Sequence, residues 1–573
     1  MRDTRRNPWL LALFVVLALI AGACGSDDDD DPTAGEDTEE ETDSKDIEER
    51  GAGGSLVYAA DQEPTGFNGN TSKDNGTSVK NVIENLFFYA VKATPEFGLD
   101  YVGLEGEPEI VSEDPQVIEW KIKKSAAWDD GKPVTTDDVE YFYEQIELKD
   151  PAKVSEDNPK GYVNDVANHV GYEQITKFEA VDDKTFRVTF DPVFADFRGL
   201  WTDIPQAAFM KAQAGGWDTG LDANPGPSAG PYKFKEWKKG ESLTLEKNTK
   251  WWGEDKPTLD TIVFRFLPES TTQPDALRNN EVDMIYPQPQ LDLVDQVEQL
   301  TDVKSEIGFG PVFEHLTFNL KNEFLKDLAV RKAIAHGVDR DAIVNALMKP
   351  FSDKAARLDN RVLVSNQEGY EANGKEYQKV DPAKAEEALK AGGYTKGADG
   401  FYAKGGKKIS LRISTTAGNQ LREQQGELIK AQLAKVGIEL RIDNSPSTVL
   451  FRDRLPAGDF DIANFAWVGS VFPVGGAKQI YETGSDSNYG AYSNAEFDKV
   501  AKEGASELDD KKQLELADEM DKEMWKDLPN LPLYQKPTFL GIRNQFVNVG
   551  DNTTNEGPFW NSQVWGVSKA AAA

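Results

Sequence analysis

From Ser55 onward, the sequence alternates between segments with the pattern of strands and segments with the pattern of helices. The segment 185–190 (TFRVTF) places bulky apolar residues at every second position, which is typical of a half-buried strand. The segment 421–436 instead repeats apolar residues along one helical face, Gly437 ends it, and a second alternating segment follows at 438–442. This alternation along the whole body predicts an α/β fold.

The composition is that of a water-soluble globular protein with a strong negative charge. Of the 573 residues, 39% are hydrophobic and 28% are charged, and the formal net charge is −35. The length is sufficient for about three lobes with well-filled cores. Phosphate backbones and anionic lipid surfaces repel such a chain, so we expect no nucleic-acid partner and no electrostatic attachment to membranes.

The N-terminus has the pattern of an export signal that ends at the single cysteine. Three arginines precede an apolar run at 9–21, which is shorter than the roughly 20 residues that a membrane-spanning helix needs. Cys24 follows three small residues, and this arrangement resembles a bacterial lipobox, in which the cysteine is acylated after cleavage. We therefore interpret residues 1–24 as a signal peptide with a lipobox and Cys24 as the lipidation site. An ordinary secretory signal cut near Ala23 is the alternative.

Residues 25–54 are expected to form a disordered acidic tether. The stretch 25–50 holds 14 acidic residues against only Lys45 and Arg50, and it cannot bury enough apolar surface to offset its chain entropy. Five consecutive aspartates at 27–31 raise the alternative of a metal-gathering patch, but an unstructured chain offers no fixed coordination geometry. We expect no bound metal and no cofactor.

The body carries a series of short motifs that together resemble a known family. They occur in a fixed order at 63–68, 128–139, 229–234, 316–340, 381–394, 433–440, 459–467 and 531–534. In this order they resemble the family 5 extracellular solute-binding proteins, which are the oligopeptide-, dipeptide- and nickel-binding components of ABC importers. Most of these positions also have a structural interpretation, because Thr135 and Asp138 have the spacing of a capping box and Asp339 precedes a helix.

The resemblance implies a two-lobed, periplasmic-binding-protein-like fold of type II, cluster C, with an extra subdomain in the first lobe. The chain is expected to cross between the lobes near 307–314 and again near 528–534. We expect lobe I to combine 55–75, 208–310 and 530–573, the extra subdomain to span 76–207, and lobe II to span 311–529.

The resemblance also implies a function. Two lobes close over an oligopeptide or peptide-like solute, which peptide-binding members hold as an added strand, and deliver it unaltered to an ABC permease. The resemblance implies that the protein is not an enzyme and that it is a monomer. It is expected to lie at the outer face of the cytoplasmic membrane, in an extracellular or periplasmic position, with a lipid as its only membrane anchor. The alternative is a non-transporting regulatory homologue that acts on cell-envelope partners.

The resemblance implies that three segments contact the solute: the loop 71–75, the segment 464–470 around Trp467, and Tyr534. A structural role is the alternative for each: a surface turn for 71–75, core filling for Trp467 and packing at the crossing for Tyr534. The implied ligand-binding residues are Thr71, Asp74, Asn75, Asn464, Phe465, Ala466, Trp467, Gly469, Ser470 and Tyr534.

One position departs from the family pattern. Many peptide-binding relatives have an aspartate three residues after this tryptophan, where it pairs with the α-ammonium group of the ligand, but here the residue is Ser470. A hydroxyl cannot balance a buried positive charge. Either Asp74 takes this role, or the solute is something other than a standard short peptide with a free amino group.

The sequence gives little support to an enzyme. The segment 226–230 (GPSAG) fits the G-x-S-x-G pattern of hydrolases, but prolines surround it and a strand pattern follows where a helix is needed. His169, His315 and His336 lack the spacing of metal ligands, and a protonated His336 would suit the end of a helix. No phosphate-binding loop is present, so ATP hydrolysis belongs to a partner.

Overall fold

The computed structural model describes residues 47–155 and 158–572. The predicted signal, Cys24 and most of the predicted tether lie outside the described residues. From Glu48 onward the described chain forms one compact unit. Its ordered part begins earlier than expected, because β1 (Arg50–Gly51) pairs antiparallel with β22 (Gly566–Ser568). The predicted tether therefore extended too far toward the body.

The largest sheet in the described chain has ten strands and is mixed. Its strand order is β18 (Glu439–Ile442), β17 (Ser410–Ser414), β19 (Ile462–Val468), β13 (Val303–Phe318), β20 (Asn530–Arg543), β12 (Met284–Ile285), β2 (Ser55–Ala60), β11 (Thr261–Phe266), β10 (Ser242–Lys247) and β9 (Tyr232–Lys238). At its centre, β13 pairs antiparallel with β19 on one side and with β20 on the other, whereas β2 pairs parallel with β11 and β12.

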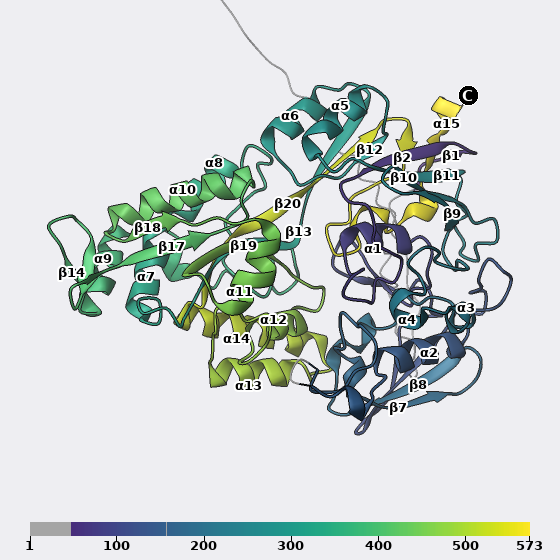
Figure 1. Cartoon of the computed structure of the whole chain (residues 1–573), viewed down its shortest axis with the longest axis horizontal. Helices are drawn as coiled ribbons and strands as arrows, with labels where there is room; N and C mark the ends of the chain where they lie inside the picture. The colour runs from purple at the N-terminus through teal and green to yellow at the C-terminus, as the bar shows by residue number, and fades with distance from the viewer. Residues whose placement is uncertain (1–46, 156–157, 573) are drawn as a thin grey trace, which may run out of the picture. The chain divides into compact units, whose positions relative to one another are not determined.

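Two large apolar cores lie toward opposite ends of this strand order. One contains Leu56 of β2 and Ile262 of β11, and the other contains Leu411 of β17, together with residues of the helices that cover that end. The long strands β13 and β20 run side by side between the two ends (Figure 1). The architecture is therefore α/β with two lobes joined by strands.

Helices cover both lobes. Those at the β17–β19 end are α7 (Leu328–Gly337), α8 (Arg340–Leu347), α9 (Pro382–Ala391), α10 (Gln420–Lys435), α11 (Leu455–Ala457), α12 (Pro473–Tyr481), α13 (Ala495–Gly504) and α14 (Asp510–Asp527). The remaining helices are α1 (Thr77–Ile83), α2 (Thr136–Ile146), α3 (Ala207–Ala212), α4 (Gly216–Thr219), α5 (Gln273–Arg278), α6 (Leu291–Glu298) and α15 (Lys569–Ala572).

A separate four-stranded sheet lies within the segment 76–207, hereafter the subdomain. Its order is β5 (Glu109–Glu113), β6 (Gln116–Lys121), β8 (Thr185–Phe190) and β7 (Ile175–Ala180). Exposure along β8 alternates as predicted, and α2 begins after Thr135, whose N–H donates to Asp138 Oδ2 at 3.0 Å. Short strands β3 (Lys92–Ala93), β4 (Leu99–Asp100), β14 (Thr395–Lys396), β15 (Tyr402–Lys404), β16 (Lys407–Lys408) and β21 (Phe546–Val547) complete the described sheets.

Several local predictions are confirmed by the backbone. Asp339 caps α8, because its Oδ1 accepts the N–H of Ala342 at 2.9 Å. Gly437 follows α10 with a φ of +81°, a left-handed conformation that glycine adopts without steric cost, and β18 begins two residues later.

Candidate functional site

The segments predicted to cross between the lobes lie on or beside the two long strands. The segment 307–314 is part of β13, and 528–534 begins directly after α14 and includes the start of β20. The pairing of the two strands is interrupted between Phe309 and Phe313, where the register shifts. Their role as hinges stays a prediction.

A buried polar network ties the crossing strands to the second lobe. The guanidinium of Arg422 on α10 donates to both carboxylate oxygens of Glu314 on β13, with Nη2 to Oε1 at 2.8 Å. Asn464 on β19 donates to Glu314 Oε2 at 3.3 Å and accepts from Gln425 at 2.7 Å. The hydroxyl of Tyr534 on β20 donates to Gln425 at 2.6 Å.

Two predicted site residues therefore belong to this network. Asn464 and Tyr534 have no exposed surface, and burial raises the pKa of the Tyr534 phenol well above its usual value. Their side chains hold β19 and β20 in place, and contact between either one and a solute stays a prediction.

Aromatic side chains gather at the end of β19. Trp467 is only partly buried; it packs edge-on to Phe465 at 5.1 Å between ring centres and stacks on Tyr489 at 5.8 Å. His315 on the neighbouring strand stacks on the same tryptophan, and burial lowers its pKa to about 3, so the ring is neutral at physiological pH. Trp467 thus packs against its neighbours and keeps some exposed surface, as does Ala466.

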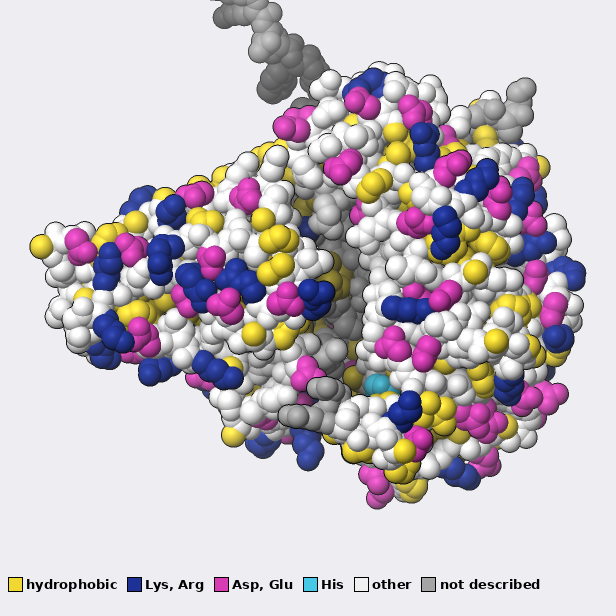
Figure 2. Space-filling model, viewed as in Figure 1, with side chains coloured by type: hydrophobic (Ala, Val, Ile, Leu, Met, Phe, Trp, Pro, Cys, Tyr) yellow, Lys and Arg dark blue, Asp and Glu magenta, His cyan; other side chains and the backbone are white. Residues whose placement is uncertain are grey.

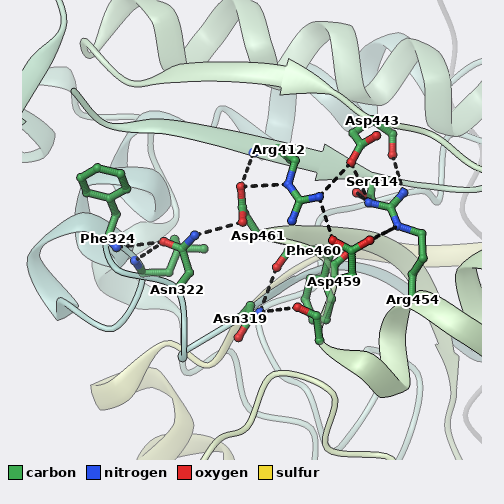
Figure 3. Close-up of polar contacts among 12 residues, drawn as sticks. Asn319, Asn322, Phe324, Arg412, Ser414, Asp443, Arg454, Asp459, Phe460 and Asp461 are labelled. Carbon is green, nitrogen blue, oxygen red and sulfur yellow. Dashed lines mark hydrogen bonds and ion pairs between the residues drawn. The ribbon is translucent and has the colours of Figure 1, made fainter. Parts of the chain in front are cut away.

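The start of β19 is anchored by a network of aspartates and arginines (Figure 3). Asp461 accepts the backbone N–H of Arg412 on β17 at 2.8 Å, while Asp459 pairs with the Arg412 guanidinium at 2.9 Å and with Arg454 at 3.2 Å. Asn319 donates to the carbonyl of Phe460 at 2.9 Å. The Asp-Phe-Asp motif therefore sets the position of the strand that carries Phe465 and Trp467.

A polar cavity of about 340 Å³ lies where the loop after β2 and the subdomain meet the start of α12. Figure 2 shows the surface hollowed between the two lobes, with acidic and basic side chains interspersed on both sides. The cavity is lined by Gly69, Asn70, Asn75, Ala167, Asn168, Val170, Tyr172, Phe194, Asp196, Gly199, Leu200, Thr202, Asp203, Ser470, Phe472, Gly475, Gly476 and Gln479.

Two of the ten predicted ligand-binding residues, Asn75 and Ser470, line this cavity. Thr71 and Asp74 belong to the same loop but are buried, and Asp74 Oδ1 accepts the Thr65 hydroxyl at 2.6 Å. Gly469 donates its N–H to the carbonyl of Pro311 at 2.9 Å. The structure therefore brings Asn75 and Ser470 together and does not bring Asp74 to the cavity.

Residues from the subdomain also line this cavity, and sequence reasoning missed them. In the segment 193–199, the N–H of Ala195 donates to the carbonyl of Ala505 at 3.0 Å, and Asp196 Oδ1 accepts from Gln513 at 3.2 Å. Arg198 lies 3.5 Å from Asp510. These contacts join the subdomain to α13 and α14. A single sequence gives no signal for them, because their partners lie some 310 residues further along the chain.

The residues considered for catalysis have structural roles. The hydroxyl of Ser228 is buried and donates to backbone carbonyls, with Leu86 O at 2.9 Å. His169 stacks on Tyr162. Burial lowers the pKa of His336, which opposes the protonated form expected at the end of its helix. Within 47–155 and 158–572, no three His, Cys, Asp or Glu side chains are grouped as metal ligands.

Comparisons with known proteins agree with this architecture. The model of the bacterial extracellular solute-binding proteins, family 5 (middle region), matches residues 106–489. The oligopeptide-binding protein OppA of Mycobacterium tuberculosis is 30% identical over 447 residues, covering 76% of this chain and 72% of the relative. The oligopeptide-binding protein AppA of Bacillus subtilis is 26% identical, covering 92% of both chains.

Solved structures share the fold. The periplasmic EDTA-binding protein EppA superposes with a TM-score of 0.84 at 26% identity, covering 91% of this chain and 97% of that one. AppA of Bacillus subtilis in complex with a nonapeptide gives 0.72 at 23% identity, covering 91% of this chain and all of that one.

These findings define a two-lobed solute-binding fold of the periplasmic-binding-protein type. The chain belongs to the family 5 bacterial extracellular solute-binding proteins. Among the described residues, none of the helices has the length and apolarity that crossing a membrane requires.

Proposed function

We propose that this protein is the substrate-binding component of an ABC importer that captures an oligopeptide or peptide-like solute and delivers it to its permease. The observation that carries the proposal is the polar cavity, which is lined both by the β2 loop with the subdomain and by the start of α12. Its volume lies in the range of small-molecule sites. The oligopeptide-binding relatives support a peptide-like solute.

The cavity can capture a solute because its walls come from two separate sets of segments. A solute in the cavity contacts 69–75 and 194–203 from one side and 470–479 from the other, and it makes both sets of contacts only when these segments are close together. Binding therefore favours the closed arrangement by the free energy of the additional contacts. The protein performs no chemistry on the solute.

The proposed crossings and lobe boundaries fit this motion. We propose that the chain crosses from lobe I to lobe II on β13 near 307–314. It crosses back near 528–534, at the start of β20. The interrupted pairing around Phe309 and Phe313 supports a flexible position on β13.

The charges that line the cavity indicate which kind of solute it can hold. EppA, whose structure is similar at 26% identity, binds EDTA, which carries several negative charges. The cavity lining of this chain has two carboxylates and no lysine, arginine or histidine, so a polyanion of that kind is disfavoured here. A peptide-like solute that is neutral or carries a positive group fits better.

Attachment to the membrane is proposed from the sequence alone. Acylated Cys24, which lies outside the described residues, would anchor the protein by lipid at the outer face of the cytoplasmic membrane, with residues from 25 to the start of β1 as a spacer. A monomer suffices for this role. The regulatory homologue that acts on envelope partners remains the alternative.

The test is native mass spectrometry of the purified chain, followed by identification of any released molecule. A bound peptide-like solute at one equivalent per chain supports transport. A chain that comes out empty and fails to bind any member of a pool of tri- to pentapeptides contradicts it. Cell-envelope proteins crosslinked to such an empty chain would favour the regulatory alternative.

A further inference from the structure

The charges in the polar cavity have one sign. Asp196 and Asp203 are the charged residues of its lining, and the remaining polar residues of the lining are neutral. Because a half-buried carboxylate gains from a partner of opposite charge, such a lining favours a ligand with positive charge.

Asp203 already has partners outside the cavity. Its Oδ1 accepts the hydroxyl of Tyr89, and the ammonium of Lys80 favours its charged form, although burial still raises the pKa of Asp203 to about 6. Glu556, which pairs with Lys80 at 3.6 Å, acts in the opposite sense. Asp203 is therefore held in place by the subdomain side of the cavity.

Asp196 is placed differently. Gln513 donates to its Oδ1, while its Oδ2 approaches the first turn of α12, where a Cβ added to Gly475 would lie only 2.1 Å from it. A Cβ added to the next residue, Gly476, would lie 3.3 Å from the Cβ of Ser470. Asp196, from the subdomain, and Ser470, from the segment before α12, therefore both lie beside this glycine pair.

The neighbouring base does not neutralise Asp196. Arg198 favours the charged form of Asp196. The same guanidinium also pairs with Glu107 and lies 3.5 Å from Asp510, so three carboxylates share this one base. Burial raises the pKa of Asp196 to about 6 despite Arg198 and the hydrogen bond from Gln513. A carboxylate in this position gains a partner when a cationic group enters the cavity.

We propose that Asp196 pairs with a protonated amino group of the solute, beside Ser470 and the glycines in the first turn of α12. The inference rests on the proposed function and deepens it, because it assigns the solute a positive group. Asp196 thereby becomes the residue that determines specificity at this end of the cavity. Asp74, buried against Gly66 and outside the lining, does not take that role.

The test compares charged and neutral probes on matched variants of the mature chain. The probes are a pool of tri- to pentapeptides with free amino termini and the same pool after N-acetylation, both titrated by calorimetry. The variants are Asp196→Asn and, as a control, Glu179→Gln, which removes an exposed carboxylate from β7 of the same subdomain.

We expect the wild-type chain and Glu179→Gln to bind the free pool about 30-fold more tightly than the acetylated pool, the ratio that corresponds to about 2 kcal/mol for a desolvated charge pair. In Asp196→Asn this ratio should fall to near one, with affinity for the acetylated pool unchanged. A ratio that survives in Asp196→Asn overturns the inference. So does an equal loss for both pools, because it would mean that Asp196 acts only through its contact with Gln513.

A second probe separates failure of this inference from failure of the proposed function. If the wild-type chain binds neither pool, the peptide-importer proposal fails, and 1,5-diaminopentane, a simple diamine, is titrated instead. Binding of the diamine to the wild-type chain that is lost in Asp196→Asn supports the cation site, and absence of binding overturns it.

Discussion

Replacing Glu314 by glutamine should destabilise the second lobe strongly. Both oxygens of this buried carboxylate accept hydrogen bonds: Oε1 from Arg422 at 2.8 and 3.0 Å, and Oε2 from Arg422 at 3.2 Å and from Asn464 at 3.3 Å. A glutamine has one NH₂ group, and either orientation of its amide points that group at an existing donor. It also leaves the Arg422 guanidinium without its counter-charge.

The magnitude follows from the burial of the pair. The side chains of Glu314 and Arg422 are 1% and 10% exposed, so water replaces little of the lost interaction. Removing one partner of such a pair costs about 3–5 kcal/mol. In urea unfolding followed by tryptophan fluorescence, the midpoint should move to lower urea with the slope preserved.

Two further variants serve as controls for the loss of this buried pair. Glu427→Gln, on the same helix as Arg422, breaks an exposed pair with Lys430 and should change the free energy of unfolding by less than about 0.5 kcal/mol. The double variant Glu314→Leu with Arg422→Met should recover most of the loss, because it removes both buried charges. A cost for Glu314→Gln within about 1 kcal/mol of that for Glu427→Gln would refute the reasoning.

Three other predictions concern the cavity and the G-x-S-x-G segment. In Gly199→Ala the new Cβ would lie 2.4 Å from the ring of Phe472, the residue before α12, so solute affinity measured by calorimetry should fall about tenfold or more. Gly106→Ala, whose new Cβ points into open space, should not alter the affinity. Because burial raises the pKa of Asp196 and Asp203 from 3.8 to about 6, the folded chain binds more protons than the unfolded chain between these values, and the free energy of unfolding should decline from pH 4 to pH 6. Burial also raises the pKa of Asp551 to about 6, so the double Asp→Asn variant should keep part of this decline, and an undiminished decline in that variant would contradict the prediction. Ser228→Ala should lower the free energy of unfolding by about 1–3 kcal/mol without affecting solute binding, and labelling of this serine by a fluorophosphonate would argue against its structural role.

Much of the fold could be predicted because its signals are local. The alternation in 185–190 reports a strand with one covered face, and the positions of Asp339 and Gly437 mark where helices begin and end. Each of these signals depends on the backbone preferences of a few neighbouring residues, and tertiary packing did not override them.

The candidate site was predictable only where its residues lie on segments that the family motifs identify. Asn75 and Ser470 were expected beside the solute and line the cavity, whereas Tyr534 and Asn464 proved to be buried in a polar network. The loop that holds Asp74 was recognisable, but which of its side chains turn inward depends on what packs beneath it. Here Asp74 turns toward Thr65 and away from the cavity.

By itself, the sequence determined the α/β class, the order of the elements and the family, because hydrophobic periodicity, caps and turn residues act over short stretches of chain. Only the tertiary structure decided that Asp196 meets Gly475 and Gln513, which lie about 280 and 320 residues further along. These contacts form only when surfaces that are distant in the sequence pack against each other. The hydrophobic periodicity of the segments that carry these residues does not predict them.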